Sequence, residues 1–126
     1  TVFQEATFHE HVRRELEDAD WIQIVELTTN SLYTLLAERL DRGEAEAISL
    51  AVETSADLIL IDEADGRREA QELGIVVTGL LGVLVRAKKQ GLIPAVRPEI
   101  NRLVLAADFW LGQDVINEAL VLAGER

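Results

Sequence analysis

The sequence predicts an α/β protein with three layers, α/β/α, built around a central parallel sheet. An unbroken apolar run, Leu58–Ile61, is typical of a strand that is buried on both of its faces. A helical segment and a second short apolar segment, Ile75–Gly79, follow it in the order typical of parallel βαβ units. Aromatic residues make up only 5% of a chain that is 48% hydrophobic, so Leu, Ile, Val and Ala must build the core. We expect one domain spanning residues 1–126.

The N-terminal part of the chain predicts a helix followed by a strand. Over residues 5–19, apolar side chains recur at helical spacing and charged side chains occupy the positions between them. The segment Trp21–Leu27 is rich in residues that favour strands. We therefore expect a strand there.

Two helices in tandem are predicted next. The first has Asn30 or Ser31 as the residue whose side-chain oxygen accepts from the free amides of the first turn, and it ends near Gly43. The second covers residues 44–55, where an apolar pattern of helical period begins with acidic residues that suit the positive end of the helix dipole.

The second half of the sequence continues this alternation. The strand Leu58–Ile61 ends at the charge of Asp62, and the helix that follows stops at Gly74. The next strand is followed by a helix over residues 80–90. After Pro94 the pattern predicts two more helices, broken around Asp108–Gly112.

Composition excludes several kinds of site. The chain has no cysteine, so zinc–thiolate sites and thiol nucleophiles are ruled out, and any metal must be held by oxygen. The longest apolar stretch, Gly74–Val85, is too short and too glycine-rich to span a bilayer, so we expect a cytoplasmic protein that does not contact membranes. The net charge of −11 argues against generic nucleic-acid binding, but carboxylates gathered around a divalent ion also make a domain acidic.

Three acidic residues are candidates for such a site. Asp62 ends a buried strand, and ligands of open α/β sheets bind beyond the carboxyl ends of strands, although an Asp there can equally cap the next helix. Glu44 and Glu46 open one helix but diverge by about half a turn, so only one of them can face a site. Acids from separate elements are typical ligands of Mg²⁺ or Mn²⁺.

The basic residues and histidines carry less weight. Arg67 and Arg68 could bind phosphate or pair with neighbouring acids. His9 and His11, two residues apart on one helix, face different directions, so we expect them on the surface. The sequence has no nucleophile elbow, no phosphate-binding loop and no dinucleotide-binding glycine pattern.

Three blocks of the sequence together resemble a prokaryotic branch of the PIN-domain family, small metal-dependent ribonucleases that often act as toxins. The blocks are "LDRGEAEAISLAVE", "LILIDEADGRREAQELGIVVTGLLGVLVRAKKQGLIPAV" and "FWLGQDVINEALVLAGE". The resemblance covers nearly the whole chain from Val2 onward, and its most specific part is the Gly-Glu-Ala-Glu-Ala-Ile block with the later Asp-ending strand and Arg-Arg pair.

The resemblance implies a catalytic metal site. Glu44 matches the family's acid at the start of a helix, Asp62 matches the acid that ends the next strand, and Glu5 of "VFQE" becomes a third acid. These three residues are the implied metal ligands and catalytic residues, with Mg²⁺ or Mn²⁺ as cofactor in two-metal hydrolysis of RNA.

The remaining implied roles are secondary. Arg67 is the first and Arg68 the second choice for a phosphate-binding residue. Glu46 is a neighbour of the site that either supports a metal ligand without touching the metal or stays in solvent. The implied function is that of a divalent-metal-dependent endoribonuclease in its intact form, plausibly a toxin with an antitoxin partner. The alternative is a PIN-like binding or assembly module that has lost the chemistry. A receiver-like or flavodoxin-like domain ranks last, because no suitable Lys follows the late strand.

The sequence departs from the family pattern at one point. PIN domains begin with a central strand that ends in an Asp, and no such segment precedes Thr1. Either the chain is a shortened version, or a second copy fills the gap, since an unpaired buried strand edge tends to recruit another chain. We therefore expect a homodimer or larger assembly.

Overall fold

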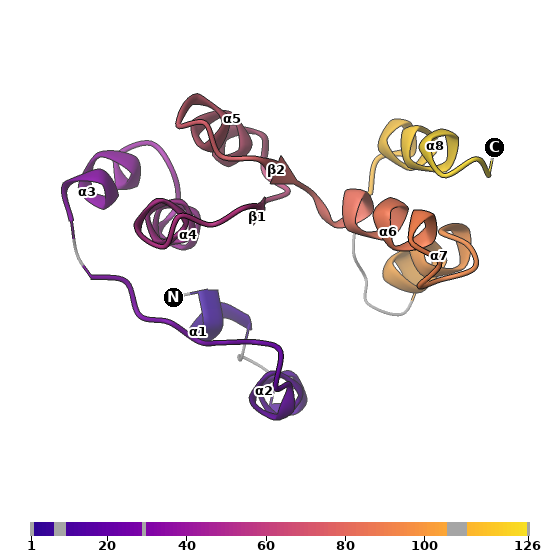
Figure 1. Cartoon of the computed structure of the whole chain (residues 1–126), viewed down its shortest axis with the longest axis horizontal. Coiled ribbons are helices and arrows are strands. Elements are labelled where there is room, and N and C mark those ends of the chain that lie inside the picture. The colour runs from indigo at the N-terminus through magenta and orange to yellow at the C-terminus, as the bar shows by residue number, and fades with distance from the viewer. Residues whose placement is uncertain (1, 7–9, 29, 106–110, 126) are drawn as a thin grey trace. The chain divides into compact units, whose positions relative to one another are not determined.

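The computed structural model describes residues 2–6, 10–28, 30–105 and 111–125 and has the expected α/β composition (Figure 1). Helices alternate with two short strands, and the two strands pair as a parallel sheet. The internal contacts divide the chain into two compact units, Thr1–Val77 and Thr78–Arg126. The three-layer arrangement and the single domain stay predictions.

The first unit contains most of the elements. They are α1 (Val2–Ala6), α2 (Glu10–Asp18), α3 (Ser31–Ala37), α4 (Arg42–Glu53), β1 (Ile59–Leu60), α5 (Ala64–Glu72) and the start of β2 (Val77–Thr78). The helix expected over residues 5–19 is therefore represented by α1 and α2, while residues 7–9 lie outside the described part of the chain.

Short polar residues set the helix boundaries in this unit. The Oδ1 atom of Asn30 accepts a hydrogen bond from the backbone N–H of Tyr33 at 2.8 Å and so caps α3. Asp41 caps α4 in the same way, because its Oδ1 accepts from the N–H of Glu44 at 2.9 Å. The expected Asn30 cap is confirmed. Gly74 follows α5 with a φ of +78°, a left-handed conformation that favours glycine, as expected of a helix stop.

The predicted strand over Trp21–Leu27 is wrong, because residues 22–28 have no regular secondary structure. A strand exists only where a neighbour accepts its ladder of hydrogen bonds. No backbone hydrogen bond joins Gln23–Leu27 to another described residue. Strand-forming side chains alone therefore do not produce a strand here.

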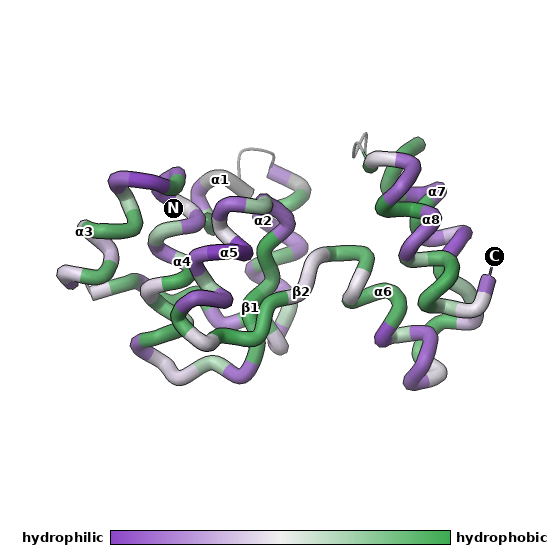
Figure 2. Tube along the Cα trace, turned by 90° about the horizontal axis from the view of Figure 1, so that it is seen from above, coloured by the Kyte–Doolittle hydropathy of each residue, from purple (hydrophilic) through white to green (hydrophobic). Residues whose placement is uncertain are grey.

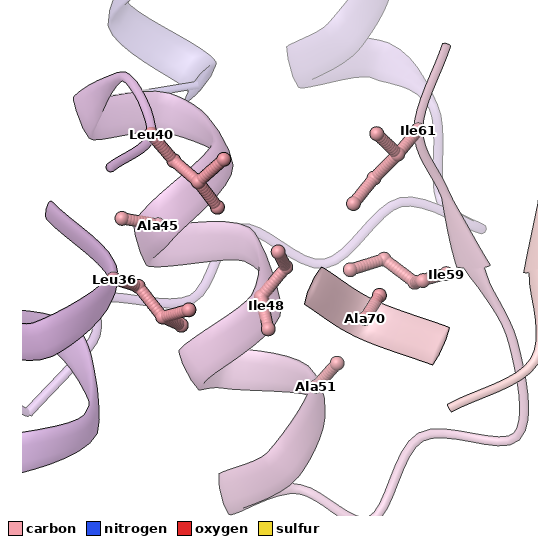
Figure 3. Close-up of a cluster of buried hydrophobic side chains, with 8 residues drawn as sticks. All are labelled: Leu36, Leu40, Ala45, Ile48, Ala51, Ile59, Ile61 and Ala70. Carbon is pink, nitrogen blue, oxygen red and sulfur yellow. The ribbon is translucent and has the colours of Figure 1, made fainter. Parts of the chain in front are cut away.

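The core of the first unit lies between the sheet and three helices. Ile59 and Ile61 point to one face of β1 and pack against residues of α3, α4 and α5, as Figure 3 shows. The buried cluster is made of Leu36, Leu40, Ala45, Ile48, Ala51, Ile59, Ile61 and Ala70. Leu60, which alternates with Ile59 and Ile61, is 54% exposed. The expectation that this run is buried on both faces is therefore wrong for the first unit.

The second unit is helical apart from the end of β2. It consists of α6 (Leu80–Lys89), α7 (Arg97–Leu105) and α8 (Gln113–Leu122), and it has a hydrophobic core of its own. Figure 2 shows how hydrophobic and hydrophilic residues alternate along these helices, as expected for helices with one buried face. The core residues are Leu81, Val85, Val96, Ile100, Ala119 and Leu120.

One acidic side chain joins the three helices of this unit. The carboxylate of Glu125 accepts from the backbone N–H groups of Val96 at 2.6 Å and Arg97 at 3.1 Å, at the start of α7. It also forms an ion pair with Lys88 of α6, with an Nζ–Oε2 distance of 3.1 Å.

Within the described residues, no helix is long and apolar enough to cross a membrane.

Candidate functional site

The carboxylate of Glu44 lies against the first turn of α5, in the first unit. The cap at Asp41 starts α4 and so places Glu44 in the first turn of that helix. A Cβ atom added to Gly66 of α5 would lie 3.4 Å from Cδ and 3.5 Å from Oε2 of Glu44. It would also lie 3.1 Å from Cγ2 of Ile61. The lack of a side chain at Gly66 therefore leaves the space that the Glu44 carboxylate occupies.

This carboxylate sits in an unfavourable electrostatic environment. Burial raises the pKa of Glu44 above its ordinary value, and the negative charges of Asp41, Glu63 and Asp65 raise it further. A hydrogen bond from the backbone of Asp41 to the Glu44 carboxylate lowers this pKa but does not outweigh these effects. The fold thus brings acidic residues from the start of α4 and the start of α5 to one place. A bound divalent cation would reverse this penalty, because an opposite charge favours the ionised form.

Asp62 lies close to this place in the chain. It follows Ile61, whose side chain contacts the same side of Gly66 as Glu44, and it directly precedes Glu63. Its side chain is exposed, and it is not among the carboxylates that raise the pKa of Glu44. The structure therefore places Glu44 within electrostatic reach of Glu63 and Asp65. A joint site of Glu44 and Asp62 stays a prediction.

Two other predicted residues fall outside the described side chains. Glu5 belongs to α1, but its side chain lies outside the described residues, so its role as a third acid stays a prediction. The same holds for the two histidines: His9 and the side chain of His11 lie outside the described part.

Glu46 and the two arginines are placed more clearly. Glu46 pairs with Arg42, one turn earlier in α4, with an Nε–Oε1 distance of 3.3 Å. Arg67 is half-buried and lies one turn after Glu63 on the same side of α5, since residues four apart are neighbours on a helix. Arg68 is exposed. Neither arginine forms an ion pair with any residue that the structure describes, so both are available to an anionic ligand.

Sequence reasoning selected Asp62 and did not select the acids that surround Glu44. Asp41 reads as a helix cap, Glu63 as the residue that precedes α5, and Asp65 as an ordinary acid of its first turn. The signal that could have found them is the block "DEADG" directly after a buried strand, because it places carboxylates and a glycine at the carboxyl edge of the sheet.

The chemistry of this place fits a hydrated divalent cation. Across the described residues, no group of three or more His, Asp or Glu side chains is arranged to hold a metal ion by itself. Mg²⁺, however, usually keeps several waters and is bound by only one or two carboxylates. The partly buried Glu44 carboxylate, which packs against Gly66 and is surrounded by further acids, suits such an ion.

Comparison with known proteins decides the family. The model of one family, DUF3368, described as a PIN domain, matches residues 1–125. The chain belongs to the PIN-domain family. This match confirms the resemblance noted in the sequence. No significant match was found among curated proteins or among solved structures.

Membership in the PIN-domain family gives the acidic site its context. PIN domains are generally nucleases, they generally use divalent metal ions, and the family membership suggests RNA binding. The carboxylates at the start of α4 and α5 are of the residue type that this chemistry needs. Zinc–thiolate chemistry is excluded, because the chain has no cysteine.

Proposed function

We propose that this PIN domain is a divalent-metal-dependent endoribonuclease whose intact form uses Mg²⁺ or Mn²⁺ held by Glu44 and Asp62, with Glu5 as a third acid. The observation that carries the proposal is the state of Glu44: its carboxylate is partly buried among other carboxylates, and its pKa is raised. Without a bound cation, the repulsion between these carboxylates only destabilises the folded protein. A bound cation offsets this repulsion, so the arrangement suits a cation-binding protein.

The residues around Glu44 have separable tasks in this proposal. Asp41 fixes the first turn of α4 and thereby orients Glu44, and the missing side chain at Gly66 lets the Glu44 carboxylate pack against α5. Arg67, on the same side of α5 as Glu63, contacts a phosphate of the substrate. The metal, when bound, activates a water molecule and neutralises charge that develops on the phosphate.

The acidic composition favours RNA binding by the metal-loaded protein over RNA binding by the metal-free protein. A net charge of −11 repels a polyanion, so the empty site opposes binding. Cations gathered at the site lower this repulsion where the substrate must approach. Arg67 and Arg68 add positive charge on α5. RNA affinity should therefore depend on the divalent metal.

Two partners expected from the sequence belong to the same proposal. The first is an antitoxin protein that would restrain the nuclease, and the second is another copy of the chain in a homodimer. Both stay predictions. The structure describes a single chain, and PIN-domain membership alone does not decide between them.

The test is cleavage of an oligoribonucleotide with and without Mn²⁺ by the wild type, Glu44→Gln, Asp62→Asn and a control variant, Glu118→Gln. Glu118 is exposed on α8, so its substitution removes the same charge in the other unit. We expect Mn²⁺-dependent cleavage by the wild type and Glu118→Gln only. Metal-dependent cleavage that survives Asp62→Asn would remove Asp62 from the mechanism. An absence of cleavage by every variant would favour the PIN-like binding module.

A further inference from the structure

One ion pair links the turn before α4 to α5, beside the acidic site. The Nη1 atom of Arg39 lies 3.2 Å from Oε1 of Glu69. Arg39 belongs to the turn between α3 and α4, and Glu69 lies in the second turn of α5. The other arginine–carboxylate pairs of the described residues each lie within a single helix. This pair therefore fixes an arginine between two separate elements of the first unit.

Both partners of the pair neighbour residues that act on Glu44. Arg39 comes two residues before Asp41, which caps α4 and whose charge raises the pKa of Glu44. Glu69 lies one turn after Asp65, another of the acids that raise this pKa, on the same side of α5. Since four residues rise about 6 Å along a helix, Glu69 holds the guanidinium roughly one turn from the acids that begin α5.

The guanidinium of Arg39 is anchored but open to solvent. The Glu69 side chain is only 15% exposed, whereas that of Arg39 is 60% exposed. Leu40 and Ala70, which follow the two partners in the chain, belong to the same buried cluster (Figure 3). Among the described residues, Glu69 is the one partner of the Arg39 side chain. Because a guanidinium has five N–H donors, the pair leaves donors for another ligand.

We propose that Arg39, held in place by Glu69, binds a backbone phosphate of the RNA next to the phosphate that is cleaved. This inference rests on the proposed ribonuclease function and says where its substrate is held. The planar fork of an arginine contacts two phosphate oxygens at once. An arginine that is already ordered by a carboxylate loses less side-chain entropy when it binds. Glu69 is a positioning residue, because it acts on the substrate only through Arg39.

The first test measures how the affinity for RNA depends on salt. The full chain binds a single-stranded oligoribonucleotide in Ca²⁺, which also takes oxygen ligands, and fluorescence anisotropy follows binding over a range of KCl concentrations. Each phosphate that a protein cation neutralises contributes about 0.7 to the slope of log affinity against log salt. Arg39→Gln should therefore make this slope less steep by about 0.7 and lower the affinity by roughly two- to tenfold.

The control for this test is Arg102→Gln. Arg102 is another exposed arginine that pairs with a glutamate, but it lies in the second unit. Its substitution removes the same charge and should leave the salt slope unchanged. An unchanged slope in Arg39→Gln, or an equal change in both variants, would overturn the proposal.

Glu69→Gln separates positioning from general electrostatics. If only net charge mattered, the loss of a negative charge would strengthen RNA binding. If Glu69 positions Arg39, the affinity should instead fall by roughly two- to fivefold, the range for one exposed ion pair. Glu72→Gln removes the same charge from an exposed position of α5 that forms no ion pair with a described residue, so it should not weaken binding. Equal effects of Glu69→Gln and Glu72→Gln would refute the positioning role.

Two further variants keep the result independent of folding. Arg39→Lys retains the positive charge but not the fork, so the salt slope should stay while the affinity falls. The double variant Arg39→Gln with Glu69→Gln leaves no partly buried charge without a partner, and its slope should match that of Arg39→Gln. A double variant with the slope of the wild type would show that Arg39 contacts no phosphate.

Cleavage with Mn²⁺ distinguishes a failure of this inference from a failure of the proposed function. We expect Arg39→Gln to raise KM and to leave kcat within about twofold, because a contact to a phosphate that does not react is the same in the ground and transition states. Binding and cleavage that are both insensitive to Arg39→Gln would overturn the role of Arg39 alone. A wild type that neither binds nor cleaves RNA would overturn the nuclease and this inference together.

Discussion

Replacing Glu44 by glutamine should make the metal-free protein more stable, although it removes the proposed metal ligand. Three neighbouring carboxylates act on Glu44, and like charges on a protein surface cost about 0.2–0.5 kcal/mol each, which gives about 1 kcal/mol of repulsion. The position of Glu44 at the start of α4 returns about 0.3–1 kcal/mol through the helix dipole. Because burial adds to the repulsion and the pKa is raised overall, the unfavourable effects win.

We therefore expect Glu44→Gln to raise the free energy of unfolding by about 0.5 kcal/mol and the melting temperature by roughly 2–3 °C at neutral pH without metal. The sign follows from linkage. A raised folded-state pKa means that the wild type gains stability as the pH falls through that pKa. The difference between variant and wild type should thus be largest at neutral pH and vanish in acid, where Glu44 is protonated.

Adding Mn²⁺ should reverse the order of the melting temperatures of the wild type and Glu44→Gln. A ligand present at a hundred times its dissociation constant stabilises the folded state by about 2.7 kcal/mol, so wild type with Mn²⁺ should melt above Glu44→Gln. Differential scanning calorimetry of both proteins and of the control Glu118→Gln, with and without Mn²⁺, measures this. If Mn²⁺ raised the melting temperature of Glu44→Gln as much as that of the wild type, Glu44 would not be a ligand.

Three further substitutions test the surroundings of the site and the two cores. Gly66→Ala gains about 1 kcal/mol of helix propensity, but the added methyl group would lie 3.1 Å from Ile61, and this crowding costs about 1–3 kcal/mol. Chemical denaturation should therefore show that the free energy of unfolding falls by about 0–2 kcal/mol. Mn²⁺ binding should also be weaker. Ile48→Ala removes a fully buried side chain and should cost about 2–5 kcal/mol in the same assay; a loss near zero would contradict the packing. Glu125→Gln should lower the melting temperature at neutral pH, because the N–H groups of Val96 and Arg97 and the charge of Lys88 hold the pKa of Glu125 below its ordinary value. The loss should shrink as the pH falls through the folded-state pKa of Glu125. A loss that is independent of pH would rule out the charge of Glu125 as the cause.

The sequence predicts the elements that depend on local signals. Asn30 caps α3 because its side chain reaches an amide three residues later, and Gly74 ends α5 because its backbone is left-handed. These interactions lie within a few residues of each other, so a short window of sequence contains them. The apolar run before Asp62 likewise marks β1, although only Ile59 and Leu60 form the strand.

The predictions that failed depend on distant neighbours. The side chains of Ile22–Leu27 favour a strand, but pairing needs a second segment, and the sequence of one strand does not state whether that segment is present. Burial of Leu60 depends in the same way on what covers the second face of the sheet. The approach of Glu44 to Gly66 joins residues of two helices, and spacing along the chain does not reveal it.

The most direct test of the central claim is titration of the ¹⁵N-labelled protein with Mn²⁺, whose unpaired electrons broaden the NMR signals of nearby amides. Binding at the proposed site should first broaden the amides of Gly43–Ala45 and Asp62–Gly66, and the effect should disappear in Glu44→Gln. Uniform broadening, or broadening confined to other acidic parts of the chain, would contradict a metal site between the first turns of α4 and α5.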